Sequence, residues 1–291
     1  MLARSTLTRS FSRLTKYPIV ILGGGAGGVS LAASLIRTKK ISPRDIAIID
    51  HSKVHHYKPG WPLYITSHMD KSSIEQSMSS SIPEGVNLIQ SRVEGIDGDR
   101  VITAQGEIEY GQLVVALGVE SDFSFAEGLD DAIRAGRVCS VMDSYERVKS
   151  SAKEFKKGRA VFAEGKGPLS CPGASLSLLF LLKEQWPSTV STTFIHPNPL
   201  PHPIPFYASQ ILTELDAQGV THKPNHLLKK ITSNTAVYED QVTGKELSMD
   251  YDWMHVMPSQ QGPSNLRKSG LVDNRGFVMV DKGSLKSRIK D

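Results

Sequence analysis

One stretch of sequence, residues 18–50, restricts the fold more than any other. Residues 18–22 are a short apolar run, which is typical of a strand buried on both faces of a parallel sheet. The sequence GGGAGG follows at residues 23–28, and an apolar helical segment comes next. A second apolar run, residues 46–49, ends at Asp50. This order predicts a β-α-β unit of an α/β protein.

The glycine turn contains the pattern G-x-G-x-x-G as Gly23, Gly25 and Gly28. A tight turn, a close approach of a pyrophosphate and a helix packed against the sheet each require a residue without Cβ. The helix is expected to begin near Ala26 and to direct its N-terminal amides at the phosphates. Asp50 is placed to accept hydrogen bonds from a ribose diol. The stretch therefore predicts a dinucleotide site, without distinguishing FAD from NAD; the alternative is a glycine-rich turn that binds no ligand.

Residues 1–16 differ in composition from the rest of the chain. They are rich in Ser, Thr and Arg, and their positive charges are Arg4, Arg9, Arg13 and Lys16. These charges account for the whole formal net charge of +4, so the remainder is neutral and gives no reason to expect nucleic acid binding. The segment also places apolar residues on one helical face, which predicts a mitochondrial presequence. The alternative is a tail of incidental basic composition.

No later segment is long enough to span a membrane. The longest apolar stretch after the leader, residues 174–182, is far shorter than the roughly twenty residues that a spanning helix requires. Any membrane association is therefore expected to be peripheral.

The chain has two cysteines, Cys139 and Cys171, which exclude a disulfide scaffold and a four-cysteine zinc site. Cys139 lies near an apolar strand edge, and we expect it to serve packing. Three histidines follow Asp50, but no cysteine or carboxylate completes a set at ligand spacing, so no metal is expected; they are His51, His55 and His56. The aromatic loop that continues from them is instead expected to cover the ring or the diphosphate of a cofactor.

Short strands follow from residue 86, at residues 86–89, 92–96, 101–103 and 107–110. Turns containing glycine separate them, so we expect a small antiparallel β meander over residues 86–110. The buried run after it ends in Ala116-Leu117-Gly118, where the glycine lets the backbone pass close to a ligand. A strand with this ending after a meander resembles the two-dinucleotide flavoproteins. The order therefore favours FAD over a simple NAD dehydrogenase.

A second β-α-β unit is predicted from residue 159, with its helix at residues 173–185. The loop before this helix has its glycines out of register with G-x-G-x-x-G, and Cys171 stands in it. Cys171 is expected at or just before the helix N-terminus, where Pro172 fits the first-turn preference and amide dipoles favour a thiolate. A thiolate attacks sulfur or a flavin ring, so Cys171 is a candidate redox residue; the alternative is a buried structural cysteine.

Six motifs together resemble the mitochondrial type of sulfide:quinone oxidoreductase. They are the GGGAGG turn, Asp50, the HHYKPGW loop, VVALG, the SCPGA loop and the DWMHVMP strand, and the SCPGA loop is the most specific. The resemblance covers residues 17–291. It implies an FAD enzyme of the inner mitochondrial membrane that oxidises hydrogen sulfide, passes electrons to ubiquinone and gives sulfane sulfur to a small acceptor.

The resemblance also implies site residues. Cys171 would be the first of two redox cysteines that flank the flavin. Six residues would contact FAD: Gly25, Ala26, Gly27, Asp50, Lys58 and Val93. The motifs above add Gly23, Gly28, Ala116 and Gly118.

The chain departs from the family at its end. Family members continue into a strand ending in Gly-Asp-Cys, which supplies the second redox cysteine, and into C-terminal amphipathic helices that dock on the membrane. This sequence stops at Asp291, so the C-terminal part of the FAD domain, and with it the peripheral membrane contact, is expected to be missing. Two alternatives stay open: a truncated form that binds FAD without turnover, and a type II NADH:quinone oxidoreductase, which needs a working second glycine turn.

The predicted fold class is α/β, with two Rossmann-like three-layer dinucleotide-binding domains and an antiparallel β meander. After the presequence at residues 1–16, we expect an FAD-binding domain at residues 17–140. A second Rossmann-like domain with Cys171 is expected at residues 141–258. Residues 259–291 are expected to return to the FAD domain.

Overall fold

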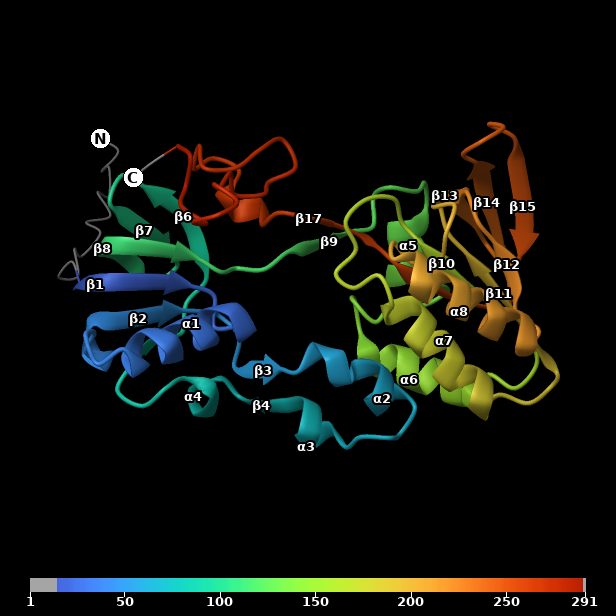
Figure 1. Ribbon diagram of the computed structural model, residues 1–291, viewed down its shortest axis with the longest axis horizontal. Helices are drawn as coiled ribbons and strands as arrows, with labels where there is room; N and C mark the ends of the chain where they lie inside the picture. Colours follow the sequence, from blue (N-terminus) through green and yellow to red (C-terminus); the bar gives the residue numbers. More distant parts are fainter. Residues whose placement is uncertain (1–14, 290–291) are drawn as a thin grey trace, which may run out of the picture. The chain divides into compact units, whose positions relative to one another are not determined.

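The computed structural model describes residues 15–289, which divide into two compact units (Figure 1). Unit 1 consists of residues 15–56, 76–119 and 262–289, and unit 2 of residues 57–75 and 120–261. The chain thus passes from unit 1 into unit 2 twice, first for residues 57–75 and then for residues 120–261. Residues 57–75 and 120–140, which the predicted domains place with the first part of the chain, have their contacts in unit 2.

Unit 1 is built on a six-stranded sheet with the order β5-β2-β1-β8-β7-β6. Its strands are β1 Thr15–Leu22, β2 Ile46–Ile49, β5 Asn87–Ile89, β6 Val93–Asp97, β7 Arg100–Thr103 and β8 Gly106–Val115. Strands β5, β2, β1 and β8 are parallel, whereas β7 and β6 are antiparallel to their neighbours. The helix α1, Ala26–Arg37, joins β1 to β2, so the predicted β-α-β unit is confirmed.

Alternation along β1 gives unit 1 a core on each face of its sheet. Ile19 and Ile21 pack with Ala32 of α1 on one face. Val20 and Leu22 pack on the other face, together with residues from the antiparallel strands. A strand buried on both faces requires the continuous apolar run that β1 and β2 have.

The predicted antiparallel meander is confirmed for β6, β7 and the first half of β8, but its predicted bounds differ from the structure at both ends. Its first stretch, now β5, pairs in parallel with β2 instead of joining the antiparallel part. Its last stretch and the following apolar run, predicted as two strands, form the single strand β8, which pairs along its length with β1. Local hydrophobic patterns identified the strands but not their partners, because pairing depends on segments far apart in sequence.

Unit 2 has a parallel four-stranded sheet with the order β12-β11-β10-β16. The strands are β10 Gly158–Glu164, β11 Val190–Ile195, β12 Thr221–Lys223 and β16 Trp253–Met257. One face is covered by the helices α7, Ala174–Gln185, α6, Tyr145–Glu154, and α2, Trp61–Ile65. The other is covered by α5, Leu129–Arg134, and by the antiparallel strands β13 His226–Thr232, β14 Thr235–Asp240 and β15 Glu246–Asp250. This gives the three layers of the predicted fold class.

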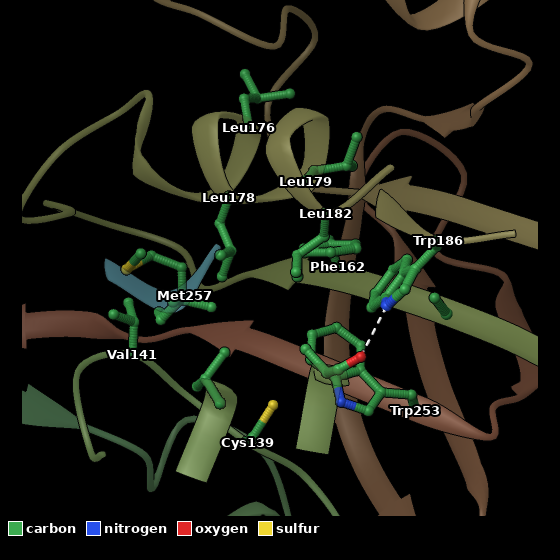
Figure 2. Packing of buried hydrophobic residues seen from close by; sticks show 14 of the residues in the cluster. Cys139, Val141, Phe162, Leu176, Leu178, Leu179, Leu182, Trp186, Trp253 and Met257 are labelled. Carbon is green, nitrogen blue, oxygen red and sulfur yellow. Dashed lines mark hydrogen bonds between the residues drawn. The ribbon is translucent and has the colours of Figure 1, made fainter. Parts of the chain in front are cut away.

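Figure 2 shows the core under α7, where Leu182 points toward Phe162 of β10. Trp186, just after α7, donates its Nε1 hydrogen to the carbonyl of Ala152 in α6 at 2.9 Å. Because this indole is almost fully buried, the hydrogen bond ties the two helices while satisfying a polar atom that would otherwise lack a partner.

The other elements are short, apart from α8, Pro205–Ala217. They are η1 Pro43–Asp45, β3 Val54–His56, η2 Lys58–Gly60, α3 Lys71–Ile74, β4 Glu75–Ser77, α4 Met78–Ser81, β9 Glu120–Asp122, β17 Ser259–Gln261 and η3 Ser264–Leu266. Strands β9 and β17 pair with each other in unit 2.

Three further sequence predictions differ from the structure. Apolar residues spaced by three or four predict a helix over residues 141–156, but the helix begins at Tyr145, because the Ser144 hydroxyl caps it by accepting from Arg147 N at 3.2 Å. The sequence also predicts a final strand at residues 276–280, but the structure has only isolated bridges there, which involve Val278 and Val280. Thr15 and Lys16, assigned to the presequence, begin β1, while residues 1–14 lie outside the described residues.

Candidate functional site

The first turn of unit 1 can be formed only by glycine at two of its positions. Gly23 has a φ of +106°, and a Cβ there would lie 2.3 Å from the carbonyl oxygen of Ala116. A Cβ on Gly28 would lie 2.0 Å from the carbonyl oxygen of Gly23. These contacts are with backbone atoms that cannot move aside, so the two glycines let the end of β1, the start of α1 and the end of β8 come together.

Gly25 has a different reason to be glycine. It is the N-cap of α1, and nothing lies within 4 Å of the position of its Cβ. No side chain caps the helix, so the amides of its first turn, which starts at Ala26 and Gly27, have no side-chain acceptor. Open space in front of uncapped amides at the positive end of a helix dipole is the geometry that binds a phosphate group.

Asp50, directly after β2, is fixed against this turn. Its Oδ2 accepts a hydrogen bond from Gly24 N at 2.7 Å, and its Oδ1 accepts from Ser52 N at 2.7 Å. The carboxylate oxygens retain further lone pairs, so Asp50 can also accept from a hydroxyl group. On the other side of Gly24, its carbonyl oxygen lies 3.0 Å from Nδ1 of His55.

The strand end predicted near the ligand lies beside the turn. Ala116 N donates to the carbonyl of Leu22 at 2.8 Å, which places the end of β8 next to the end of β1. Gly118 has a φ of +75° and an exposed backbone with open space around it. Val93 is buried at the start of β6, and its carbonyl accepts from Asn265 Nδ2 at 2.7 Å.

Lys58 and Cys171 belong to unit 2 and are thus on the other unit from the glycine turn. Lys58 is exposed, and its Nζ lies 5.6 Å from the centroid of the Trp61 ring. Trp61 in turn stacks on Tyr145 with ring centroids 5.3 Å apart. The aromatic loop is therefore anchored to α6.

Cys171 is an exposed free thiol in the loop between β10 and α7. The helix begins at Ala174 with Gly173 as its N-cap, so Cys171 lies just before the helix, as predicted. Pro172 also precedes the N-cap and is not in the first turn. The loop is bonded to β17, because Ser259 Oγ donates to the carbonyl of Lys166 at 2.6 Å.

Cys139, unlike Cys171, is buried. It is buried in the core under α7, and its Sγ donates to the carbonyl of Met254 at 3.3 Å. Burial is the main cause that raises the pKa of this thiol to about 12. Cys139 is thus protonated and inaccessible, which confirms the prediction that it serves packing.

The sequence did not identify two residues, Met78 and Asn265, that lie against the glycine turn and against Val93, respectively. A Cβ on Gly24 would lie 2.7 Å from Sδ of Met78, so the Met78 side chain packs against the turn at this glycine. Asn265 holds residues 262–289 to β6 through the hydrogen bond to Val93 described above. Neither is part of a motif, and only the pairing of distant segments reveals them. Within residues 15–289, no group of three or more His, Cys, Asp or Glu side chains is arranged to hold a metal ion.

The chain has two β-α-β units, the first with an open glycine turn and the second with a cysteine in the corresponding loop. This is the architecture of an oxidoreductase that contains two dinucleotide-binding folds. Residues 17–289 match the family described as pyridine nucleotide-disulphide oxidoreductase, and the chain belongs to this family, whose members bind FAD.

Within the family, the chain is a homologue of the sulfide:quinone oxidoreductases. It is 29% identical over 286 residues to the mitochondrial sulfide:quinone oxidoreductase of Mus musculus, an alignment that covers 94% of this chain and 63% of the mouse protein. It is 31% identical over 291 residues to the mitochondrial enzyme of Dictyostelium discoideum, with 95% and 63% covered. The chain therefore spans less than two thirds of the length of these relatives.

A solved structure shows the same fold. The sulfide:quinone oxidoreductase of Aquifex aeolicus superposes with a TM-score of 0.78 at 22% sequence identity, covering 91% of this chain and 64% of that one. The predicted α/β fold class is thus confirmed.

Proposed function

We propose that this chain binds FAD at the glycine turn of unit 1 and takes part in the oxidation of hydrogen sulfide, with Cys171 as the residue that receives the sulfur. Electrons would pass to ubiquinone, and the sulfane sulfur to a small acceptor. The observation that carries this proposal is the exposed free thiol of Cys171 in a chain homologous to sulfide:quinone oxidoreductases.

The residues of the turn fit the cofactor. The uncapped amides of α1, next to Gly25, would hold its pyrophosphate, and Asp50 would accept from the ribose diol. The exposed backbone at Gly118 and the end of β8 at Ala116 would let the flavin part approach closely. Val93 and Lys58 are further proposed contacts, on the family resemblance. When bound, FAD accepts two electrons and passes them on singly or as a pair.

Cys171 would hold the sulfur during the reaction. Hydrosulfide would lose one proton and two electrons, the electrons going to the bound FAD, as its sulfur becomes bonded to the Cys171 thiolate sulfur, which yields a persulfide. A small thiolate acceptor then attacks the outer sulfur, and the thiolate of Cys171 leaves. Summed over a turnover, hydrosulfide, an acceptor thiol, quinone and one proton give an acceptor persulfide and quinol, so that atoms and charge balance.

The loop that carries Cys171 argues against NADH as the reductant. Gly165 is closed by packing, because a Cβ there would lie 2.7 Å from Ser259 Oγ, and the glycines do not follow the phosphate-binding spacing. Oxidation of NADH by the purified protein, with quinone as acceptor, would instead support a type II NADH:quinone oxidoreductase.

We further propose a mitochondrial location with peripheral contact to the inner membrane, which rests on the relatives and on the composition of residues 1–16. No helix among residues 15–289 combines the length and apolar character that crossing a membrane requires.

Flavin bleaching tests the proposal. The protein is purified, loaded with FAD and mixed with sulfide in the absence of oxygen, and the flavin absorbance is followed. We expect bleaching in the unmodified chain and in Cys139→Ser, and none in Cys171→Ser. Bleaching in Cys171→Ser at the unmodified rate would refute the function of Cys171. FAD binding without any bleaching would identify a form that binds the cofactor without turnover.

A further inference from the structure

The carboxyl ends of β10 and β16 form a distinct part of unit 2. The next strands of the chain, β11 and β12, lie on one side of β10, whereas β16 pairs with β10 on its other side. The order in which the chain adds strands to the sheet therefore reverses at β10. In parallel α/β sheets, ligands bind outside the carboxyl ends of the strands at such a point. Three segments meet there: the loop of residues 165–173, the first turn of α7 and the strand β17.

Hydrogen bonds hold these segments together. Gly165 N donates to the carbonyl of Met257 at 2.9 Å, and Gln260 N donates to the carbonyl of Pro168 at 2.9 Å. The residues that follow β16 therefore run beside the residues that follow β10.

Three buried polar side chains in this region have atoms without a hydrogen-bond partner among the described residues. They are Oε1 of Glu164, Oγ of Ser175, and both Oε1 and Nε2 of Gln260. Glu164 and Gln260 are each 3% exposed, and Ser175 is 0% exposed. Unpaired buried polar atoms are rare and destabilising, and several in one place indicate a missing water, ion or ligand.

Glu164 and Ser175 face the same interface. Phe162, two residues before Glu164, packs under α7, and side chains alternate along a strand, so Glu164 also points to the α7 side. It is in register with Met257, which packs in the same core. Ser175 is one turn before Leu178 and Leu179, on the buried stripe of α7 that faces the sheet. Both side chains thus lie at the N-terminal end of the contact between α7 and β10.

The first turn of α7 adds backbone donors. Its N-cap is Gly173, which has no side-chain cap and has open space around the position of its Cβ. The amides of Ser175 and Leu176 therefore have no acceptor in the helix itself, and they lie at the positive end of a helix of 12 residues.

Glu164 is neutral at physiological pH. Burial alone raises the pKa of this carboxyl group to about 8. The neighbouring strands place two histidines near it, His196 after β11 and His255 in β16, and burial lowers the pKa of both to about 3, so they are uncharged. The cation of the loop, Lys166, is bonded to Gln241 Oε1 at 2.8 Å. The acids of the adjoining strand β9 are Glu120 and Asp122, and Asp122 accepts from Ser124.

We propose that these groups form a binding site for a small inorganic oxyanion, held by hydrogen bonds from the carboxylic acid of Glu164, the Ser175 hydroxyl and the first-turn amides of α7. A site made of neutral donors at a helix N-terminus attracts an anion through the dipole. Ionisation of Glu164 would add a negative charge to the site and repel the anion. Binding is therefore controlled by pH, and it does not depend on FAD or on the proposed sulfide reaction.

Sulfate is the probe, because its charge is constant between pH 7 and pH 9. Binding is measured by isothermal titration calorimetry on the full chain. We expect saturable binding at pH 7 that is about tenfold weaker at pH 9, because about one tenth of Glu164 remains neutral one unit above its pKa. Glu164→Gln, a neutral variant of the same shape, should bind sulfate with less than about threefold change over this range.

Two variants complete the test. Ser175→Ala removes a buried hydroxyl that has no partner, so folding should persist while the affinity for sulfate falls about tenfold. Glu184→Gln makes the matched substitution at an exposed position near the other end of α7, and it should leave sulfate binding and its pH dependence unchanged. The proposal is overturned if sulfate does not bind saturably, if unmodified protein binds it equally at both pH values, or if Ser175→Ala binds it as tightly as the unmodified chain.

Discussion

Gly24 donates its amide hydrogen to Oδ2 of Asp50 at 2.7 Å. The carboxylate that the sequence assigns to a ribose diol therefore also holds the glycine turn to the end of β2. If Asp50 also binds the ribose, as we propose, it links the shape of the turn to the binding of FAD.

Replacement of Asp50 should separate these two functions. Asp50→Ala removes the acceptor for Gly24 N and for Ser52 N, so we expect lower stability by about 1 to 3 kcal/mol and loss of FAD. Asp50→Asn keeps one acceptor oxygen, and it should recover part of the stability. The measurement is the ratio of flavin to protein absorbance after gel filtration, together with urea unfolding. Asp99→Ala, at an exposed turn of the same unit, is the control. Full FAD retention in Asp50→Ala would contradict the assignment.

Two glycines of the turn should respond differently to alanine. Gly23→Ala places a Cβ against the carbonyl of Ala116 at a positive φ, and we expect a loss of about 2 kcal/mol or more in the free energy of unfolding. Gly25→Ala meets open space, so its loss should stay below about 1 kcal/mol. The Cβ of Gly25→Ala would nevertheless occupy the space proposed for the pyrophosphate. Urea unfolding of the apoprotein and FAD titration separate the two effects, and unchanged FAD affinity in Gly25→Ala would exclude this position from the cofactor site.

The β-α-β unit at residues 18–50 could be predicted from sequence because it is local. An apolar run buried on both faces, a glycine turn and a helix are all recorded in consecutive residues. The pairing of β8 with β1, or the packing of residues 57–75 in unit 2, depends on contacts between distant segments. Hydrophobic periodicity gives no information about such partners. For the same reason, the sequence could not predict the hydrogen bond of Asn265, which forms only where residues 262–289 meet β6.

The two cysteines should differ in reactivity. Cys171 is exposed, whereas burial raises the pKa of Cys139 to about 12 and removes it from solvent. We expect iodoacetamide at pH 8 to modify the native chain once, at Cys171, and to modify both cysteines only after unfolding. Peptide mass spectrometry locates the modified residue. Rapid labelling of Cys139 in the native chain would show that the core under α7 opens.

His255 should make unit 2 sensitive to acid. Its Nε2 accepts from Val141 N at 3.1 Å, and burial lowers its pKa to about 3. The folded state therefore binds fewer protons than the unfolded state between pH 6.5 and pH 3, so stability falls as the pH falls through this range, by about 1.4 kcal/mol per pH unit. His255→Gln keeps an acceptor without titrating, and its stability should depend less steeply on pH.

Urea unfolding at pH 7 and at pH 5 measures this difference. His68→Gln, at an exposed histidine, is the control and should follow the unmodified chain. Equal pH dependence in His255→Gln and the unmodified chain would show that His255 does not carry this sensitivity.

The most direct test of the proposed function is the covalent state of Cys171 after reaction with sulfide. The full chain is loaded with FAD, mixed with sulfide and ubiquinone, alkylated and digested, and the peptides are analysed by mass spectrometry. We predict that the peptide with Cys171 gains the mass of one sulfur atom and that the peptide with Cys139 does not. An unmodified Cys171 in a sample whose flavin has been reduced by sulfide would contradict the account.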